Sequence, residues 1–127
     1  MTNAKLAEQK AQLGKARDFL NRVLAAPENE IQRAAAIQAF EFSFELSWKY
    51  LKTLLEADGK SIFASPRAIF RDAAQHGFID NPEQWFGFLE YRNLTAHTYV
   101  EAVAEKVYAK IQTELVAALD ELINIKA

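Results

Sequence analysis

The four glycines and three prolines of this chain are expected to mark joints between longer segments, and this expectation constrains the fold more than any other feature. Between the joints, apolar residues recur at helical spacing, and no segment shows the strict alternation that is typical of a strand. A segment without helix-breaking residues can continue for many turns. The sequence therefore predicts an all-α protein.

Local start and stop signals predict where each helix begins and ends. Pro27-Glu28-Asn29 separates the first two helices, and Asp58-Gly59 ends the second. Ser65-Pro66 and Asn81-Pro82 each place a capping side chain before a proline at the first helical position. Gly77 ends the short helix between them. The expected helices span residues 4–25, 30–57, 66–76, 82–96 and, from 100 or 101, a last helix that continues to 125.

The size and charge of the chain limit its functions. Its 127 residues are expected to form one domain, residues 1–127. The net charge of −2 gives no general attraction for nucleic acid, so any contact with RNA or a nucleotide must be local. The absence of cysteine excludes disulfides and thiolate metal sites, and it fits a reducing cytoplasm. No apolar run is long enough to cross a bilayer, so no membrane association is expected.

The second expected helix is apolar on two sides, with a polar strip that includes Glu41 and Glu45 between them. Such a helix needs two partners. One partner is the rest of the chain, and a second copy in a symmetric homodimer would be the other. The alternative is that five helices of a single chain bury both stripes. The stripes consist of Ile37, Phe40, Phe44, Trp48, Leu51 and Leu55, and of Ala39, Phe42, Leu46 and Tyr50.

The richest candidate site lies between Tyr91 and Tyr99. Arg92 and His97 are five residues apart, Asn93 follows the arginine, and Tyr99 comes two residues after the histidine. Arginine holds phosphate in a rigid fork of donors, and histidine transfers protons near neutral pH. These residue types suit chemistry on a phosphodiester. On an unbroken helix Arg92 would lie to one side of His97, whereas a helix end near His97 would let both aim at one pocket.

Each of these residues also has an ordinary structural explanation. His97 could cap the end of a helix by bonding its terminal carbonyls. Arg92 could pair with Glu90, Glu101 or another surface carboxylate. Tyr99 could be a core residue whose hydroxyl reaches the surface. The spacing alone does not decide between these interpretations and the catalytic one.

The sequence predicts no metal site and no cofactor. The two histidines, His76 and His97, lie far apart, and no pair at metal-binding spacing accompanies them. Glu41 and Glu45 could hold magnesium, but a solvated helix face is the preferred interpretation. The chain contains no glycine-rich phosphate loop and no Ser/His/Asp arrangement.

Two motifs resemble those of a known family. Residues 92–99, Arg-Asn-Leu-Thr-Ala-His-Thr-Tyr, are similar to the Arg-x4-His-x-Tyr motif of the HEPN superfamily, in its HepT toxin branch. Residues 40–49, Phe-Glu-Phe-Ser-Phe-Glu-Leu-Ser-Trp-Lys, resemble the signature of the nucleotidyltransferase substrate-binding protein group. The likeness extends from about Ala34 to Tyr99.

The resemblance implies a HEPN-like fold, an up-and-down four-helix-type bundle with an extra short helix, which forms a homodimer. It implies the toxin of a type VII-like toxin–antitoxin pair, a metal-independent endoribonuclease with its cleft at the dimer interface. The partner would be an MntA-like minimal nucleotidyltransferase that transfers AMP from ATP to Tyr99. His97 would act as acid and base, Arg92 would stabilise charge at phosphorus, and Asn93 would orient His97 or bond to phosphate.

Two other functions are consistent with the sequence. The chain could be a non-catalytic subunit that offers substrate to a nucleotidyltransferase, a role that the acidic net charge favours. It could also be a helical dimerisation module whose polar motif only caps a bend. The combination of Arg92 and His97 favours the ribonuclease.

Overall fold

The computed structural model describes residues 2–59 and 65–126, and every regular element within them is helical. The predicted all-α fold is confirmed, and the predicted helix ends agree with the structure to within two residues. No helix in these ranges combines the length and the apolarity that a membrane span requires. The elements are α1 (Thr2–Ala25), α2 (Glu30–Ala57), α3 (Pro66–Gln75), α4 (Pro82–Leu94), η1 (Thr95–His97), α5 (Glu101–Lys110), η2 (Ile111–Leu115) and α6 (Val116–Ile123).

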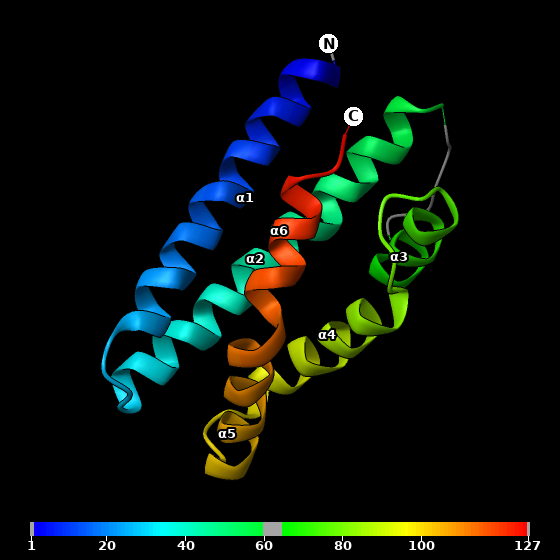
Figure 1. Ribbon diagram of the computed structural model, residues 1–127. Helices are drawn as coiled ribbons and strands as arrows, with labels where there is room; N and C mark the ends of the chain where they lie inside the picture. Colours follow the sequence, from blue (N-terminus) through cyan, green and yellow to red (C-terminus); the bar gives the residue numbers. More distant parts are fainter. Residues whose placement is uncertain (1, 60–64, 127) are drawn as a thin grey trace.

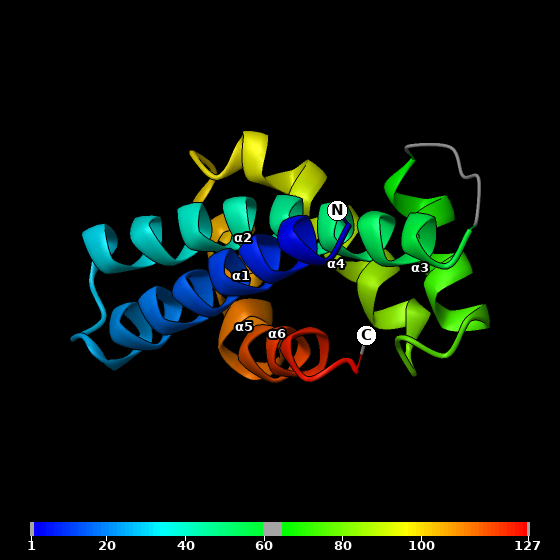
Figure 2. The same cartoon turned by 90° about the horizontal axis from the view of Figure 1, so that it is seen from above.

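The central element of the bundle is α2. It runs antiparallel to α1 along most of its length, as Figure 1 shows, and it also contacts α3, α4, α5 and α6. Seen from above in Figure 2, α1 and α2 form one layer, and α5 and α6 lie against it. The surface of α2 is therefore shared among elements that lie far apart in the sequence.

Of the two predicted cap residues, Asn81 forms the expected hydrogen bond and Ser65 does not, while Asn29 caps α2 without having been predicted to. The Asn29 side chain accepts from the backbone N–H of Gln32 at 2.8 Å, and the Asn81 side chain accepts from that of Gln84 at 3.2 Å. Ser65 precedes α3 in an extended conformation, but its side chain makes no cap hydrogen bond. The predicted capping role of Ser65 is therefore wrong, and the proline that follows it marks the start of α3 instead.

Two glycines end helices because of their backbone conformation. Gly59 and Gly77 have φ values of +82° and +85°, a region that side chains with a Cβ atom rarely adopt. They follow α2 and α3 as predicted. Gly14 and Gly87 lie inside α1 and α4, so the prediction that the glycines fall at joints is wrong for these two.

Aromatic side chains join α2, α3 and α4 into one core. Trp85 stacks on Phe70 and meets Phe88 edge to face, each with ring centroids 5.1 Å apart. From α2, Phe40 contacts Phe88 at 6.2 Å and Phe44 contacts Phe70 at 5.6 Å. All five rings are buried. This core holds α4, which carries the first half of the candidate site, against α2.

The chain itself covers most of both apolar stripes of α2. Every member is buried except Trp48 and Leu46, which are half-buried, and Phe42, which keeps 37% of its surface exposed. The Phe42 ring lies 5.9 Å from that of Phe19 on α1. This arrangement agrees with the alternative in which one chain buries both stripes. The homodimer stays a prediction. The two apolar stripes of α2 do not support it, because the chain itself covers most of both.

The last helix contains a π-helical turn that was not predicted. The chain is helical from Glu101 to Ile123, with the wider turn η2 in the middle. Within η2 the Thr113 hydroxyl donates to the carbonyl of Ala109 at 2.9 Å, and such bonds compete with the backbone ladder of a helix. The same turn places Glu114 2.7 Å from the Lys110 ammonium, and this hydrogen bond lowers the pKa of Glu114.

Candidate functional site

The candidate residues lie where α4 ends. The α-helix stops at Leu94, and the 3₁₀ turn η1 follows over Thr95–His97 before the chain enters α5. The backbone N–H of Val100 donates to the His97 carbonyl at 3.0 Å, which closes the turn. The predicted helix end near His97 is therefore confirmed. We refer to residues 92–99 as the motif turn.

Arg92 pairs with a carboxylate of α2. Its Nη2 lies 3.7 Å from Oε1 of Glu45, so the predicted ion pair forms with a surface carboxylate other than Glu90 or Glu101. Its Nε is buried and has no hydrogen-bond partner in the described part of the chain. Direct hydrogen bonds between charged groups are shorter, about 2.8 Å. Glu45 therefore holds the Arg92 guanidinium only loosely. The guanidinium still has N–H groups that could donate to another acceptor.

His97 and Tyr99 lie together on the surface. The Tyr99 hydroxyl is 3.5 Å from Nδ1 of His97, the outer limit for a hydrogen bond, and the rings meet edge to face with centroids 5.9 Å apart. Tyr99 is 81% exposed, so its interpretation as a core residue is wrong. Within residues 2–59 and 65–126, the His97 side chain bonds no helix carbonyl, and Tyr99 is its one hydrogen-bonding neighbour.

The motif turn forms two pairs rather than one cluster. Arg92 lies by Glu45 and His97 lies by Tyr99, and among the described residues no hydrogen bond or ion pair joins Arg92 to His97. Asn93 is exposed, and in the same part of the chain its side chain has no hydrogen bond to His97. The convergence of Arg92, Asn93 and His97 on one phosphate therefore stays a prediction.

A second carboxylate of α2 holds the motif turn. The buried Thr95 hydroxyl lies 3.0 Å from Oε2 of Glu41 and 2.7 Å from the Arg92 carbonyl, so the two acceptors share its proton. Glu41 and Glu45 are one helical turn apart, so both face the motif turn. The prediction of a solvated face holds only in part, because Glu45 keeps 40% of its side-chain surface exposed while both glutamates contact the motif turn. Their place within residues 40–49, the segment that resembles a family signature, was the signal that could have identified them.

Substituting Thr95 by Val is expected to loosen the motif turn. Valine has a similar shape but cannot donate to Glu41, so the carboxylate loses a partner in a part-buried position. We expect the free energy of unfolding to fall by about 1–3 kcal/mol, measured by urea titration. Thr98→Val is the control, because the Thr98 hydroxyl makes only a 3.3 Å bond to the Thr95 carbonyl. Equal losses in the two variants would contradict a specific role of Glu41.

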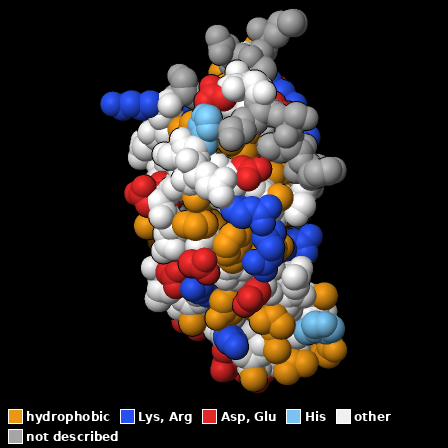
Figure 3. Space-filling view, turned by 90° about the vertical axis from the view of Figure 1, so that its right-hand side faces the viewer, with side chains coloured by type: hydrophobic (Ala, Val, Ile, Leu, Met, Phe, Trp, Pro, Cys, Tyr) orange, Lys and Arg blue, Asp and Glu red, His pale blue; other side chains and the backbone are white. Residues whose placement is uncertain are grey.

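The two histidines do not share a site. On the face shown in Figure 3 they lie at opposite ends of the molecule, and Lys and Arg side chains gather between them. The His76 Nε2 atom lies 2.5 Å from Oδ2 of Asp58, far from the motif turn. Among the residues that the structure describes, no three His, Asp or Glu side chains are grouped so that they could hold a metal ion.

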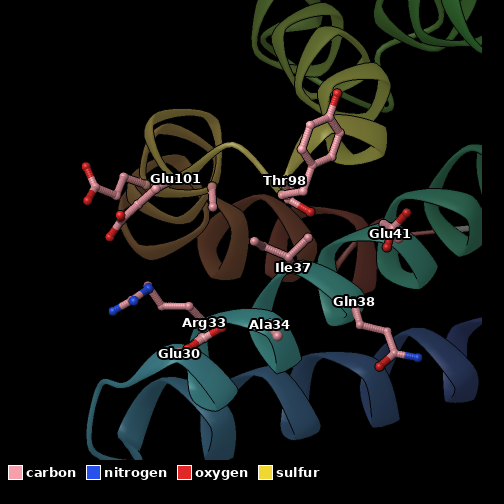
Figure 4. A pocket seen from close by; sticks show the side chains of 11 residues that line it. Glu30, Arg33, Ala34, Ile37, Gln38, Glu41, Thr98 and Glu101 are labelled. Atoms are coloured by element: carbon pink, nitrogen blue, oxygen red, sulfur yellow. The ribbon is translucent and has the colours of Figure 1, made fainter.

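A cavity of about 610 Å³ opens beside the motif turn, between α2 and α5. In Figure 4, Ile37 of α2 lies opposite Thr98 and Glu101 across this opening, whereas Gln38 extends away from them. Four of the residues that line the cavity are glutamates, and one, Arg33, is basic. The lining therefore disfavours an anion such as phosphate. The glutamates are Glu30, Glu41, Glu101 and Glu105.

Comparisons with known proteins identify relatives of this chain. A family model described as nucleotidyltransferase substrate binding protein like matches residues 4–125. A Haemophilus influenzae protein named probable ribonuclease HepT is 39% identical over 87 residues, which cover 65% of this chain and 60% of that protein. The match therefore spans less than two thirds of that relative's length.

Two solved structures share the fold. A Thermus thermophilus protein superposes with a TM-score of 0.79 and 27% identity, over 87% of this chain and 94% of that one. A Haemophilus influenzae protein, described as revealing the fold of a substrate binding domain of a nucleotidyltransferase, gives a TM-score of 0.68 and 29% identity, over 97% and 96% of the two chains. The predicted helical bundle and the predicted family are confirmed.

Proposed function

Because this chain belongs to the nucleotidyltransferase substrate binding protein like family, we propose that it is a HepT-like ribonuclease that a partner nucleotidyltransferase controls. The exposed imidazole of His97 carries this proposal, since it stands at a helix end with no capping contact among the described residues. In this proposal the chain is the toxin of a type VII-like toxin–antitoxin pair in the cytoplasm, and its partner is an MntA-like enzyme.

The proposed reaction is the cleavage of RNA by its own 2′-hydroxyl. The 2′-oxygen attacks the adjacent phosphorus, the bond from phosphorus to the 5′-oxygen breaks, and a 2′,3′-cyclic phosphate and a 5′-hydroxyl result. His97 takes the proton from the 2′-hydroxyl or returns one to the 5′-oxygen. Arg92 offsets the added negative charge at five-coordinate phosphorus. Asn93 orients His97 or donates a hydrogen bond to the phosphate, and no step uses a metal ion.

A homodimer would supply both an acid and a base. If the motif turns of two copies face one cleft, the His97 of one copy can take a proton while that of the other gives one. Tyr99 and Val100 are exposed beside His97 and offer apolar surface that a second copy could cover. Sedimentation velocity tests this part of the proposal, because a protein that stays monomeric at micromolar concentration would rule out a shared cleft.

The ribonuclease proposal is tested by expression without the partner. The wild-type chain is expected to arrest growth, and Arg92→Ala is expected to relieve the arrest, because the pentacoordinate phosphate loses its cation. Purified wild type should release cyclic phosphate ends from RNA in the presence of a chelator. Arg67→Ala is the control, because it also removes an arginine but one outside the motif turn. The Arg67 guanidinium lies over the Phe86 ring, 4.8 Å from its centroid. Arrest by Arg92→Ala at the wild-type level would refute the proposal.

Tyr99 is the proposed acceptor of AMP. Its hydroxyl oxygen attacks the α-phosphorus of ATP, pyrophosphate leaves, and the hydroxyl proton is released. Tyr99→Phe is expected to abolish the reaction, since it lacks the nucleophilic oxygen. Intact-mass measurement after incubation with ATP and the partner detects the adduct. Tyr91→Phe, on the half-buried tyrosine at the end of α4, should be modified like wild type. Unchanged modification of Tyr99→Phe would exclude this acceptor.

A second function has one observation in its favour. The cavity beside the motif turn is lined by four glutamates and one arginine, a surface that repels the backbone of RNA. A non-catalytic subunit that presents a substrate to the nucleotidyltransferase would not need to bind RNA there. Copurification with the partner, together with intact RNA after prolonged incubation with the wild-type chain, would favour this function over the ribonuclease.

A further inference from the structure

Glu45 lies between two cations that come from different elements. Its Oε1 is 3.7 Å from Nη2 of Arg92 on α4, and its Oε2 is 3.9 Å from Nζ of Lys49, one turn further along α2. Each carboxylate oxygen therefore faces its own cation. The three groups together carry one net positive charge, although the whole chain carries −2. Glu41, which bonds Thr95 in the same turn, brings the sum of these four charges to zero, so Lys49 keeps the surroundings of Arg92 from being net negative.

The distances indicate orientation rather than neutralisation of Arg92. Both separations are longer than a direct hydrogen bond between charged groups, about 2.8 Å. Arg92 has five N–H donors, of which Glu45 approaches one Nη group, while its Nε is buried without a partner in the described residues. Glu45 therefore restrains one side of the guanidinium, and the Nη donors of this side chain, which keeps 37% of its surface exposed, stay available to a bidentate acceptor.

We propose that Glu45 and Lys49 complete a phosphate-binding site around Arg92, an inference that rests on the proposed ribonuclease function. Glu45 is a positioning residue that sets the direction of the guanidinium. Lys49 offsets the charge of Glu45, so the charge around Arg92 is not net negative when a phosphate of RNA arrives. Without Lys49, the carboxylate of Glu45 would repel the same phosphate that Arg92 binds.

A second Lys–Glu pair on α2 serves as a control, because it resembles Lys49 and Glu45 but has no counterpart of Arg92. Lys52 and Glu56 are also four residues apart on α2, with a separation of 3.6 Å. Within the part of the chain that the structure describes, no cation of another element lies within ion-pair distance of Glu56. Exposed pairs of this kind contribute little to stability. Removing Lys52 or Glu56 makes the same charge change on the same helix without reaching the motif turn.

Alanine variants of the four residues separate positioning from charge. Glu45→Ala is expected to lower kcat about 10-fold without raising KM, because Arg92 loses its orientation and the phosphate loses a repelling charge. Lys49→Ala is expected to raise KM about 3-fold with kcat unchanged, and this effect should fade in about 0.5 M salt. Lys52→Ala and Glu56→Ala should stay within about twofold of wild type. Alanine favours helix, so α2 is expected to stay folded in all four.

The NMR signal of the Arg92 Nε–H group reports orientation without any cleavage. In Glu45→Ala this signal is expected to shift and to exchange faster with water, while Glu56→Ala leaves it unchanged. If the signal does not respond to Glu45→Ala, or if wild type cleaves RNA and Glu45→Ala has the kinetics of Glu56→Ala, the inference is overturned. If wild type cleaves nothing, but the signal responds and Lys49→Ala weakens the binding of a 2′-O-methyl RNA, the phosphate site stands and the ribonuclease proposal fails.

Discussion

Replacement of His97 by Ala is expected to lower the rate of metal-free RNA cleavage by roughly 10²–10⁴-fold, the contribution of one general acid or base. The imidazole is exposed just after the end of α4. Among the described residues, its hydrogen-bonding neighbour is Tyr99. The substitution therefore removes a proton carrier while leaving the buried core untouched. Single-turnover cleavage of a labelled RNA in the presence of a chelator measures the loss, and urea titration confirms that stability is kept.

The other histidine of the chain is the matched control for this experiment. His76 ends α3 and lies 2.5 Å from Asp58, so His76→Ala removes an imidazole at a site distant from the motif turn. We expect its cleavage rate to equal that of wild type. Equal activity of His97→Ala and wild type would remove His97 from the mechanism. Equal losses in the two variants would indicate that the loss reports folding rather than catalysis.

Replacement of Trp85 by Ala is expected to cost about 3–5 kcal/mol in the free energy of unfolding. The indole is fully buried between Phe70 and Phe88, with ring centroids 5.1 Å from each. No protein atom of the described residues accepts from its Nε1, so the loss is one of packing rather than of a hydrogen bond. Since this core holds α4 on α2, the motif turn should also lose its position. Urea titration followed by circular dichroism measures the change.

Phe42→Ala is the control for the loss of stability expected of Trp85→Ala. Phe42 is also aromatic, but it keeps 37% of its surface exposed, and Phe19 is the one aromatic ring of the described residues that it meets. The expected loss is about 1 kcal/mol, because much of its apolar surface stays in water in the folded protein. If both variants lost the same stability, the core described around Trp85 would not be the principal contact between α4 and the rest of the bundle.

Local features of the sequence were sufficient to predict the helices. Asn81 caps the helix that follows it as predicted, and Gly59 and Gly77 adopt the positive φ that ends the helices before them. Ser65 is the exception, because a cap needs a side-chain rotamer that sequence does not specify. The end of α4 near His97 was also predicted, since the apolar stripe stops there.

The partners of the motif turn could not be predicted in the same way. Glu41 and Glu45 have the spacing of any exposed helix face, and the sequence interpretation placed them in solvent. The aromatic core around Trp85 packs α4 on α2 and thereby brings the Glu41 carboxylate to Thr95, 54 positions away. The same packing places Glu45 beside Arg92, although Glu90 and Glu101 are nearer to Arg92 in the sequence.

The sequence by itself determined an all-helical chain, most of its helix ends and the motifs of its family, because caps, glycine conformation and apolar periodicity act over a few neighbouring residues. Only the tertiary structure decided which side chains surround Arg92, Thr95 and His97. The physical reason is that these contacts form between helices, where the choice among many similar carboxylates depends on the packing of the core and not on the residues beside them in the chain.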